Sequence, residues 1–395
     1  MIHKDQIKQL SADIFEQVVG YRRHLHANPE LSFKEYETSA FIKARLSEWG
    51  IPFKEMADTG VVALIEGALP SERVIALRAD MDALPILEAN DKPYASKNAG
   101  VMHACGHDVH SSSLLGTAYI LNTLKDKFAG TVKLIFQPAE ELLPGGASIL
   151  IKEGVLESPP VQHIIGQHVM PLIDAGKVGF RSGIYMASTD ELYVTVRGKG
   201  GHGAQPHQNI DPVLIASHII VALQQIVSRN ADPRLPSVLS FGKLEANGAT
   251  NIIPNEVKIE GTFRTLDEDW RREAKLRMKK MAEGMAESMG GSCEFRIMDG
   301  YPFLINEPAL TANVREFAED YLGKENVVDL DIWMAAEDFA YYSQVTNACF
   351  YRLGTGNKAK NTTYSVHTPN FDIDEDALQL STGLMAYAAL KQLGN

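Results

Sequence analysis

Predicted strands and helices alternate along the first 183 residues of this chain, and this alternation constrains the fold more than any other feature. Short β-branched runs that indicate strands lie at 61–66, 73–79, 131–136 and 163–169. Apolar residues at helical spacing, which indicate helices, cover 5–28, 34–49, 111–127 and 146–153. Alternating elements of this kind are typical of an α/β layer with a mainly parallel sheet and helices on both faces.

The order of predicted elements changes at about residue 184. A strand, a helix, two strands, a helix and a strand are expected at 191–197, 212–229, 237–245, 256–264, 269–288 and 293–298. This β-α-β-β-α-β order is the ferredoxin-like unit. The α/β alternation then returns at 308–322, 347–353 and 375–391. The sequence therefore predicts one domain formed by 1–183 and 300–395, with a second domain inserted at 184–299.

The charge and the cysteine content exclude several classes of protein. With 38 basic and 50 acidic residues the net charge is −12, which argues against nucleic acid or an anionic membrane as a partner. Three cysteines are too few for a disulfide framework and indicate a reducing compartment. The N-terminus has no signal-peptide pattern, and no apolar run approaches the roughly 20 residues that span a bilayer. We expect a cytoplasmic enzyme.

The segment HACGHDVH at 103–110 is the strongest chemical signal. Cys105 and His107 are separated by one residue, so in an extended or turning segment both side chains could face one centre. Thiolate and imidazole together are strong ligands for a borderline-soft divalent cation. The alternative is a buried cysteine among surface histidines.

A second signal is FQPAEE at 136–141, where a predicted strand leads into Glu140 and Glu141. Adjacent glutamates usually lie on a solvated surface. At the carboxyl end of a buried strand they could instead have different roles, with one glutamate binding a cation and the other transferring protons.

Further candidates end other predicted strands or precede the last helix. His168 ends one strand, Asp80 and Asp82 follow another, and His367 lies in a turn before the closing helix. A single histidine is more often structural than a ligand, so their case depends on the whole set. The aspartates could orient a metal-bound histidine or cap a turn.

The inserted domain has its own candidates. His202 lies in the glycine-rich segment GKGGHGAQPH, which does not match a phosphate-binding fingerprint and could be a flexible hairpin. Asn251 and Arg264 follow in GATNIIPNEV and GTFRT. The Arg264 guanidinium could bind a substrate carboxylate or pair with a surface carboxylate.

Taken in order, RRHLHANPELSFKEYET, RADMDALP, MHACGHDVH, FQPAEE, GKGGHGAQPH, GATNIIPNEV, AAEDFAYY and LGTGN resemble one family. It is the amidohydrolase branch of the dinuclear aminoacylase and carboxypeptidase metallopeptidase superfamily, with N-acyl-amino-acid amidohydrolases, hippurate hydrolases and auxin-conjugate hydrolases. The resemblance covers nearly the whole chain.

The resemblance implies a centre of two divalent metal ions, with Mn, Zn, Ni and Co not distinguished, and a general base, Glu140. The implied metal ligands are Cys105, His107, Glu141, His168 and His367. Cys105 would bridge the two ions. Where the wider superfamily has an H-x-D ligand motif this chain has Asp80-Met81-Asp82, which leaves both aspartates open as ligands.

The implied activity is hydrolysis of the amide bond of small-molecule N-acyl-L-amino acids by a metal-activated water, releasing a carboxylic acid and an amino acid. His202 would stabilise the oxyanion, and Asn251, Arg264 and the Gly354 backbone would hold the substrate carboxylate. The inserted domain would be a lid that also forms a homodimer, in which His202 could reach the partner's site.

Three alternatives stay open. A dipeptidase or carboxypeptidase acting on small peptides is the nearest. A thiol hydrolase would use Cys105 as its nucleophile. A non-catalytic metal-binding protein would leave the spare carboxylate of Glu140 without a role.

Overall fold

The computed structural model describes residues 4–394, and the chain divides into two compact units. Unit 1 comprises Met1–Tyr185, Ile305–Ile332 and Tyr341–Asn395, and unit 2 comprises Met186–Leu304 and Trp333–Ala340. The short return to unit 2 at 333–340 has no helical or strand periodicity, so the sequence did not predict it. Residues 1–3 and 395 of the predicted first domain lie outside the described residues.

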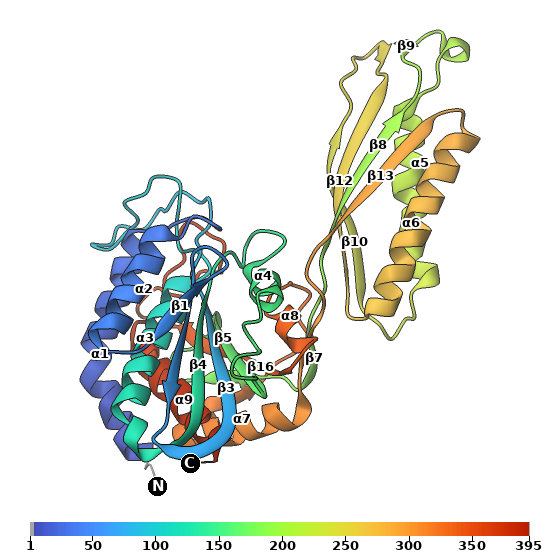
Figure 1. The fold of residues 1–395 in the computed structure, drawn as a ribbon. Coiled ribbons are helices and arrows are strands. Elements are labelled where there is room, and N and C mark those ends of the chain that lie inside the picture. Colours follow the sequence, from blue (N-terminus) through green and yellow to red (C-terminus); the bar gives the residue numbers. More distant parts are fainter. Residues whose placement is uncertain (1–3, 395) are drawn as a thin grey trace. The chain divides into compact units, whose positions relative to one another are not determined.

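Unit 1 is built around an eight-stranded sheet with strand order β1-β2-β4-β3-β5-β16-β6-β15 (Figure 1). The strands are β1 (Phe53–Met56), β2 (Gly60–Glu66), β3 (Leu69–Asp80), β4 (Ala129–Gln137), β5 (His163–Asp174), β6 (Val178–Phe180), β15 (Val327–Asp329) and β16 (Asn347–Gly356). Neighbours from β4 through β3 and β5 to β16 are parallel, whereas β1, β2 and β6 pair antiparallel with their inner neighbours. The predicted α/β class with a mainly parallel sheet is confirmed.

Helices cover the sheet of unit 1. They are α1 (Lys4–Ala27), α2 (Tyr36–Glu48), α3 (His107–Thr123), α4 (Gly146–Lys152), α7 (Pro308–Leu322), α8 (Ala340–Ser343) and α9 (Asp376–Leu393). Helices α3 and α9 pack on the central strands, and α1 packs on these two helices. Helix α4 contacts β4. Strands β4 and β16 are buried along almost their whole length, as strands covered on both faces are.

Helix α3 begins four residues earlier than predicted, at His107 instead of Ser111. The segment His107–His110 looks polar in sequence, but every one of its side chains is buried. Gly106, at φ +80°, is the residue before the helix, where a left-handed backbone favours glycine. The early start places His107 in the first turn of a helix instead of an extended segment.

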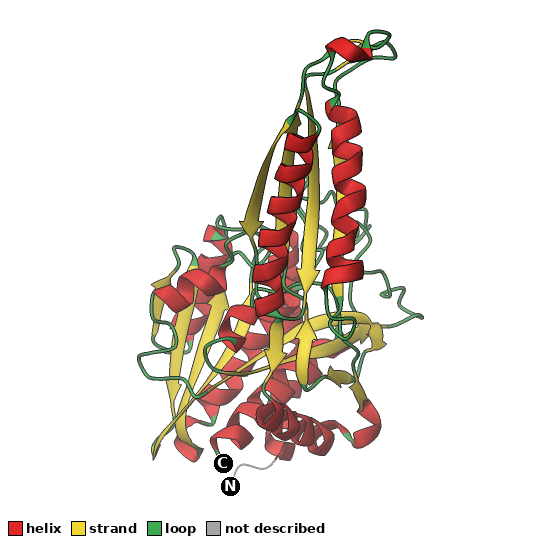
Figure 2. Ribbon diagram, turned by 90° about the vertical axis from the view of Figure 1, so that its right-hand side faces the viewer, coloured by secondary structure: helices red, strands yellow, loops and turns green. Residues whose placement is uncertain are grey.

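Unit 2 contains an antiparallel sheet of order β10-β12-β8-β13. Its strands are β8 (Asp190–Arg197), β10 (Ser237–Glu245), β12 (Glu256–Thr265) and β13 (Ser292–Asp299), and its helices are α5 (Pro212–Gln225) and α6 (Glu268–Ser288). Figure 2 shows the two long helices side by side against this sheet. In chain order the elements run β-α-β-β-α-β, and α5 and α6 are capped by Asp211 and Asp267.

The helical segment Pro212–Asn230 has the length and apolar composition of a membrane-crossing helix, although no such run was expected from the sequence. A core helix of a folded domain satisfies the same criterion. One face of this segment, with Ile215, Ile219 and Leu223, is buried in the core of unit 2.

Short elements complete the chain. They are β7 (Gly183–Met186), β9 (Gly201–His202), β11 (Ile252–Ile253), β14 (Leu304–Asn306), the 3₁₀ turns Lys125–Lys127, Pro206–Gln208 and Lys324–Asn326, and the π turn Ile226–Asn230. Of these, β9 pairs with β11 and carries His202.

Candidate metal centre

The predicted metal ligands lie at one edge of the sheet of unit 1. β3 ends at Asp80, β4 leads into Glu140 and Glu141, and His168 lies in β5. These three strands are parallel neighbours, so their carboxyl ends meet at the same edge, where open α/β sheets build their sites. The loop before α3 adds Cys105 to the same place.

Two groups of possible ligands share Cys105. In the first, ligand atoms of Cys105, His107 and His168 lie within 4.8 Å of one another, and in the second those of Cys105, Glu141 and His367 do. The Sγ atom of Cys105 is 3.3 Å from Nε2 of His168 and 3.2 Å from Nε2 of His367. The structure thus brings all five predicted ligands together, and the Cys105 sulfur belongs to both groups.

Two atoms of this cluster favour a bound cation. His107 Nε2 and Glu141 Oε1 are buried and form no hydrogen bond within the described chain. Glu141 Oε1 lies 3.2 Å from His367 Nε2, so these two ligand atoms face each other. Buried polar atoms nearly always have a hydrogen-bond partner, so two such atoms facing one cluster point to a missing ligand. Thiolate, imidazole and carboxylate together suit a first-row divalent ion.

Asp82 orients the residues around the centre. Its Oδ1 accepts hydrogen bonds from His107 Nδ1 at 3.1 Å and from Glu140 N at 3.1 Å. Its Oδ2 accepts from Ser32 Oγ at 2.6 Å and from Glu141 N at 3.0 Å. These four donors saturate a carboxylate, which leaves Asp82 as an orienting group and not a metal ligand.

Asp80 and His110 form a pair that is also satisfied internally. Asp80 Oδ1 lies 2.5 Å from His110 Nδ1, and His110 Nε2 accepts a hydrogen bond from Val169 N at 3.0 Å. Both ring nitrogens of His110 are therefore occupied. Asp80 Oδ2 accepts from Arg78 Nη1 at 2.5 Å. His168 instead donates from Nδ1 to Val169 O at 2.8 Å, which leaves its Nε2 lone pair toward Cys105.

The electrostatics of the cluster favour a cation. Burial opposes the charged form of His107, but the carboxylates of Asp80 and Asp82 outweigh it and raise the pKa of His107 to about 10. Burial, reinforced by Glu141 and other neighbouring carboxylates, raises the pKa of the Cys105 thiol well above its usual range. Without a cation both groups hold their protons at neutral pH, and binding a cation must displace them.

Glu140 lies beside this cluster and is itself buried, with 5% of its surface exposed. Its Oε2 is 4.0 Å from His107 Nε2. The residue before it, Ala139, has a left-handed backbone at φ +50°. Ligand atoms of Glu140, Glu141 and His107 lie within 4.8 Å of one another, so both carboxylates reach this cluster.

His202 and Asn251 lie together in unit 2, at the paired strands β9 and β11. Gly203 N donates to Asn251 O at 2.8 Å, and Ile252 pairs with His202. His202 Nδ1 accepts a hydrogen bond from Ala204 N at 3.1 Å, so the neutral ring carries its hydrogen on Nε2. The exposed His202 can therefore act as a hydrogen-bond donor.

Arg264 lies elsewhere in unit 2, near the last residue of β12. Its guanidinium donates to Met334 O at 3.3 Å, and no carboxylate among residues 4–394 forms an ion pair with it. Burial lowers the pKa of Arg264. A half-buried arginine without a counter-ion keeps donors for an anionic group.

The expectation for Gly354 is wrong. This residue is within β16, and its only N–H donates to Lys177 O at 2.9 Å. The β16 backbone passes so close to its neighbours that a Cβ atom at Gly354 would lie 2.2 Å from Asp174 O. The glycine is needed for sheet packing, and its backbone has no donor left for a substrate carboxylate.

A buried charge network anchors the start of α3, and it was not predicted from the sequence. Asp108 Oδ2 accepts from Arg22 Nε and from His26 Nδ1, both at 2.8 Å. Arg22 Nη2 also pairs with Asp372 Oδ1 at 2.8 Å. Asp108 is therefore a structural partner of α1 and not a metal or acid-base group of the site. The only sequence signal was the RRHLH motif of the family resemblance.

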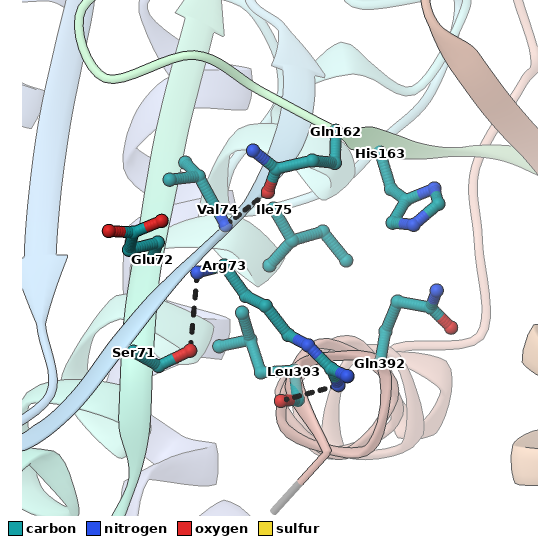
Figure 3. A pocket seen from close by; sticks show the side chains of 9 residues that line it. All are labelled: Ser71, Glu72, Arg73, Val74, Ile75, Gln162, His163, Gln392 and Leu393. Carbon is teal, nitrogen blue, oxygen red and sulfur yellow. Dashed lines mark hydrogen bonds between the residues drawn. The ribbon is translucent and has the colours of Figure 1, made fainter.

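A cavity of about 700 Å³ lies at the amino ends of β3 and β5, beside the last turn of α9 (Figure 3). Arg73, Gln162 and His163 line it, with Arg73 donating to Leu393 O at 3.2 Å. None of the predicted site residues lines this cavity.

Known proteins are similar to this chain in sequence. A model of peptidase family M20/M25/M40 matches residues 76–391. The chain is 45% identical over 304 residues to an N-acyl-L-amino acid amidohydrolase of Geobacillus stearothermophilus, which covers 77% of this chain and 81% of that one. It is 39% identical over 393 residues to thermostable carboxypeptidase 2 of Saccharolobus solfataricus, covering 98% of each chain.

A solved structure has the same fold. YXEP of Bacillus subtilis, described as a dinuclear metal binding peptidase from the M20 family, superposes with a TM-score of 0.82. It is 36% identical to this chain, and the match covers 97% of this chain and 99% of YXEP.

Proposed function

Because this chain belongs to peptidase family M20/M25/M40, we propose that it is a metal-dependent hydrolase of the amide bond of N-acyl-L-amino acids. The family predicted from the sequence is confirmed, and so is the class of enzyme. The observation that carries the proposal is the pair of ligand groups that share Cys105, with the buried carboxylate of Glu140 beside them. The 45% identity to an N-acyl-L-amino acid amidohydrolase supports the substrate class.

The metal centre holds two divalent ions in this proposal. Cys105, His107 and His168 would hold one, and Cys105, Glu141 and His367 the other. Bound divalent ions lower the pKa of water and polarise an amide carbonyl. Mn, Zn, Ni and Co all suit a mixed sulfur, nitrogen and oxygen site, so occupancy follows availability.

Glu140 is the general base. Its carboxylate takes a proton from the attacking water and then delivers it to the departing amide nitrogen, which leaves as the free amino acid. Asp82 fixes the backbone of this residue and the ring of His107, so base and ligand keep their relative positions. The Nε2–H of His202 serves as the donor to the oxyanion.

The substrate carboxylate is bound by Arg264 or Asn251, and unit 2 cannot bring both to one carboxylate. Arg264 is eight residues along β12 from Glu256, a distance of about 26 Å at about 3.3 Å per residue. β9 and β11, with His202 and Asn251, lie beyond the Glu256 end of that strand. If one active site uses His202 and Arg264, the two residues come from different copies of the chain.

This arrangement requires a homodimer. Unit 2 offers an apolar surface for a second copy, since Leu214 and Val221 lie seven residues apart on α5 and are 52% and 73% exposed. The partner would then supply His202, as the family resemblance implies, and with it the neighbouring Asn251. A reducing, cytoplasmic location would keep the thiol of Cys105 available.

A carboxypeptidase acting on small peptides is the second candidate, favoured by the 39% identity to thermostable carboxypeptidase 2. Both substrates place a free carboxylate on the amino acid that leaves, so recognition by arginine does not separate them. They differ on the acyl side, where a peptide carries an ammonium group and an N-acyl amino acid does not.

The test is a substrate panel on metal-quantified protein. Each amino acid is offered with an acetyl, benzoyl or indoleacetyl group and as the matching dipeptide. We expect the acyl amino acids to have the higher kcat/KM. Higher values for the dipeptides would establish the carboxypeptidase instead, and no hydrolysis at saturating metal would overturn both.

Thiol catalysis by Cys105 is disfavoured by its surroundings. A nucleophilic thiolate needs a lowered pKa, whereas burial and the neighbouring carboxylates raise the pKa of Cys105. Chelation distinguishes the two classes, because a thiol enzyme keeps its activity in chelator. A metal-dependent enzyme loses activity and regains it when metal is added.

A further inference from the structure

We infer that Glu35 is a positioning residue that fixes the backbone from which the general base Glu140 projects. This inference rests on the proposed function. Glu35 belongs to the segment Pro29–Glu35, which is far from Glu140 in sequence and contributes no metal ligand to the groups found among the described residues.

The Glu35 carboxylate is completely buried and binds only neutral donors. Its Oε1 accepts from Ala139 N at 2.8 Å and from Phe33 N at 3.0 Å, and its Oε2 accepts from Thr59 Oγ1 at 2.7 Å. Within residues 4–394 no Lys, Arg or His forms an ion pair with it. Burying a carboxylate without a cation beside it costs free energy. The buried position of Glu35 therefore requires a reason.

Together Glu35 and Asp82 bind three consecutive backbone amides. Ala139 N donates to Glu35, and Glu140 N and Glu141 N donate to Asp82 at 3.1 and 3.0 Å. Asp82 holds the amide of the base itself, and Glu35 holds the amide of the residue before it. The direction of the Glu140 side chain is therefore set by two carboxylates acting on successive peptide groups.

The backbone at this turn is strained and needs such support. Ala139 has φ +50° and Phe33 has φ +62°, both in the left-handed region that non-glycine residues rarely adopt. The two amides that Glu35 Oε1 accepts belong to these two residues. The turn is closed on its other side by Gly146 N, which donates to Ala139 O at 3.0 Å.

The segment that carries Glu35 is itself held rigidly against the site. Ser32 Oγ donates to Asp82 at 2.6 Å. The carboxylate of Glu30 accepts from Glu37 N and Thr38 N in the first turn of α2, at 3.1 and 2.8 Å. A rigid mount is what a positioning residue requires, since a displacement of about 1 Å at a catalytic group can cost about 100-fold in rate.

Two variants of Glu35 separate the effect of its side-chain length, called its reach, from the effect of its charge. Glu35→Gln keeps the Oε1 acceptor and loses the charge, while Thr59 Oγ can accept from its amide. Glu35→Asp keeps the charge but withdraws the oxygens from Ala139 N by one methylene. Thr59→Val is the matched control, because it removes the bond to Oε2 and leaves both amide bonds to Oε1 intact.

Positioning predicts that Glu35→Asp loses kcat by about 100-fold at unchanged metal content, with KM changed less than about threefold. Glu35→Gln and Thr59→Val should keep kcat within about fivefold of the wild type, the fluctuation expected when one neutral hydrogen bond changes. In metal-free protein, hydrogen exchange at Ala139–Glu141 should accelerate in Glu35→Asp and not in Glu35→Gln.

Several results would overturn the inference. A larger loss in Glu35→Gln than in Glu35→Asp would mean that the charge of Glu35 matters more than its reach. Equal losses would mean that reach has no special role. Full recovery of Glu35→Asp at saturating metal would make Glu35 a determinant of metal affinity. Unchanged exchange at Ala139–Glu141 in Glu35→Asp would refute the backbone contact. If the wild type hydrolyses no N-acyl amino acid, the proposed function fails while hydrogen exchange still decides the role of Glu35.

Discussion

His107 donates a hydrogen bond from Nδ1 to Oδ1 of Asp82 at 3.1 Å, and this contact leaves Nε2 buried, without a hydrogen bond and facing the metal cluster. The contact decides the tautomer of His107, because a ring nitrogen that donates carries the hydrogen. In the neutral ring this contact leaves the Nε2 lone pair of His107 toward the cluster.

Replacing Asp82 by asparagine should weaken metal binding while the protein stays folded. Asparagine has a single acceptor oxygen, and its amide nitrogen accepts from none of the four donors around Asp82, so His107 Nδ1 and the amides of Glu140 and Glu141 cannot all keep their hydrogen bonds. We expect a loss of about 10-fold to 100-fold in metal affinity. Competition with a fluorescent chelator measures it. Ser32→Ala, which removes one donor to Oδ2, is the control. Wild-type affinity in Asp82→Asn would refute the orienting role.

Metal binding should release protons and strengthen as pH rises. The pKa of His107 is raised to about 10 and that of Cys105 is raised above its usual range, so both groups are protonated near pH 7 in the metal-free protein. Each displaced proton changes the apparent affinity by about tenfold per pH unit, with weaker binding at lower pH.

Titration calorimetry in buffers of different ionisation enthalpy counts these protons. We expect about two protons released near pH 7, one from each group, and about one in Cys105→Ser. An affinity that does not depend on pH between 6 and 8 would contradict the assignment of these two groups as ligands.

Glu140→Gln and Glu141→Gln should each lower activity, but for different reasons, although the two residues are neighbours in sequence. Glu140→Gln removes the base and should lower kcat by about 10² to 10⁴-fold with the metal content unchanged. Glu141→Gln removes a ligand of the second group and should lower metal occupancy. Metal analysis beside steady-state kinetics distinguishes them. Near-wild-type kcat in metal-replete Glu140→Gln would exclude it as the base.

Periodicity predicts much of this site, because β-branched runs locate β3, β4 and β5 and the chemical residues follow each strand. It does not separate His168 from His110, which is also buried and lies three residues after His107. The two rings differ in their contacts with Val169. Its N–H donates to Nε2 of His110, and its carbonyl oxygen accepts from Nδ1 of His168. Such contacts depend on the packing of α3 against β5.

The same limit explains what the sequence missed elsewhere. Glu35 contacts Ala139 across 104 positions, and no local pattern records that contact. Gly354 has the flexible backbone expected of a binding loop, but the register of β16 commits its N–H to Lys177. Sequence patterns therefore predict the residues that carry chemistry better than those that position them.

Arg22→Met should destabilise the protein through Asp108. Both side chains are fully buried, and removing one partner of a buried pair costs about 3–5 kcal/mol. Denaturant unfolding of the metal-free protein measures the loss. Lys43→Met breaks an exposed pair with Glu55 and should cost less than about 1 kcal/mol. Equal effects of the two substitutions would contradict this account.

The stabilisation by Arg22 should also depend on pH. Burial alone would raise the pKa of Asp108, but Arg22 and His26 outweigh it and lower that pKa. A depressed pKa stabilises the folded state above the unfolded value of about 3.9, and the contribution disappears as pH falls below it. The difference in the free energy of unfolding between the wild type and Arg22→Met should therefore be largest near pH 7 and shrink below about pH 4.

Mixing two inactive variants tests whether one site draws residues from two copies of the chain. His202→Ala and Arg264→Ala are each expected to lose most activity. If His202 acts on the partner's site, a heterodimer of the two variants has one site with both residues intact and one site with neither. Co-expression with different tags allows that heterodimer to be isolated, and it should recover about half of the wild-type kcat per dimer. If both residues act within one chain, every site in the heterodimer lacks one of them and no activity returns. The separation of His202 from Arg264 along β12 favours recovery, since unit 2 holds them too far apart to contact a single small substrate.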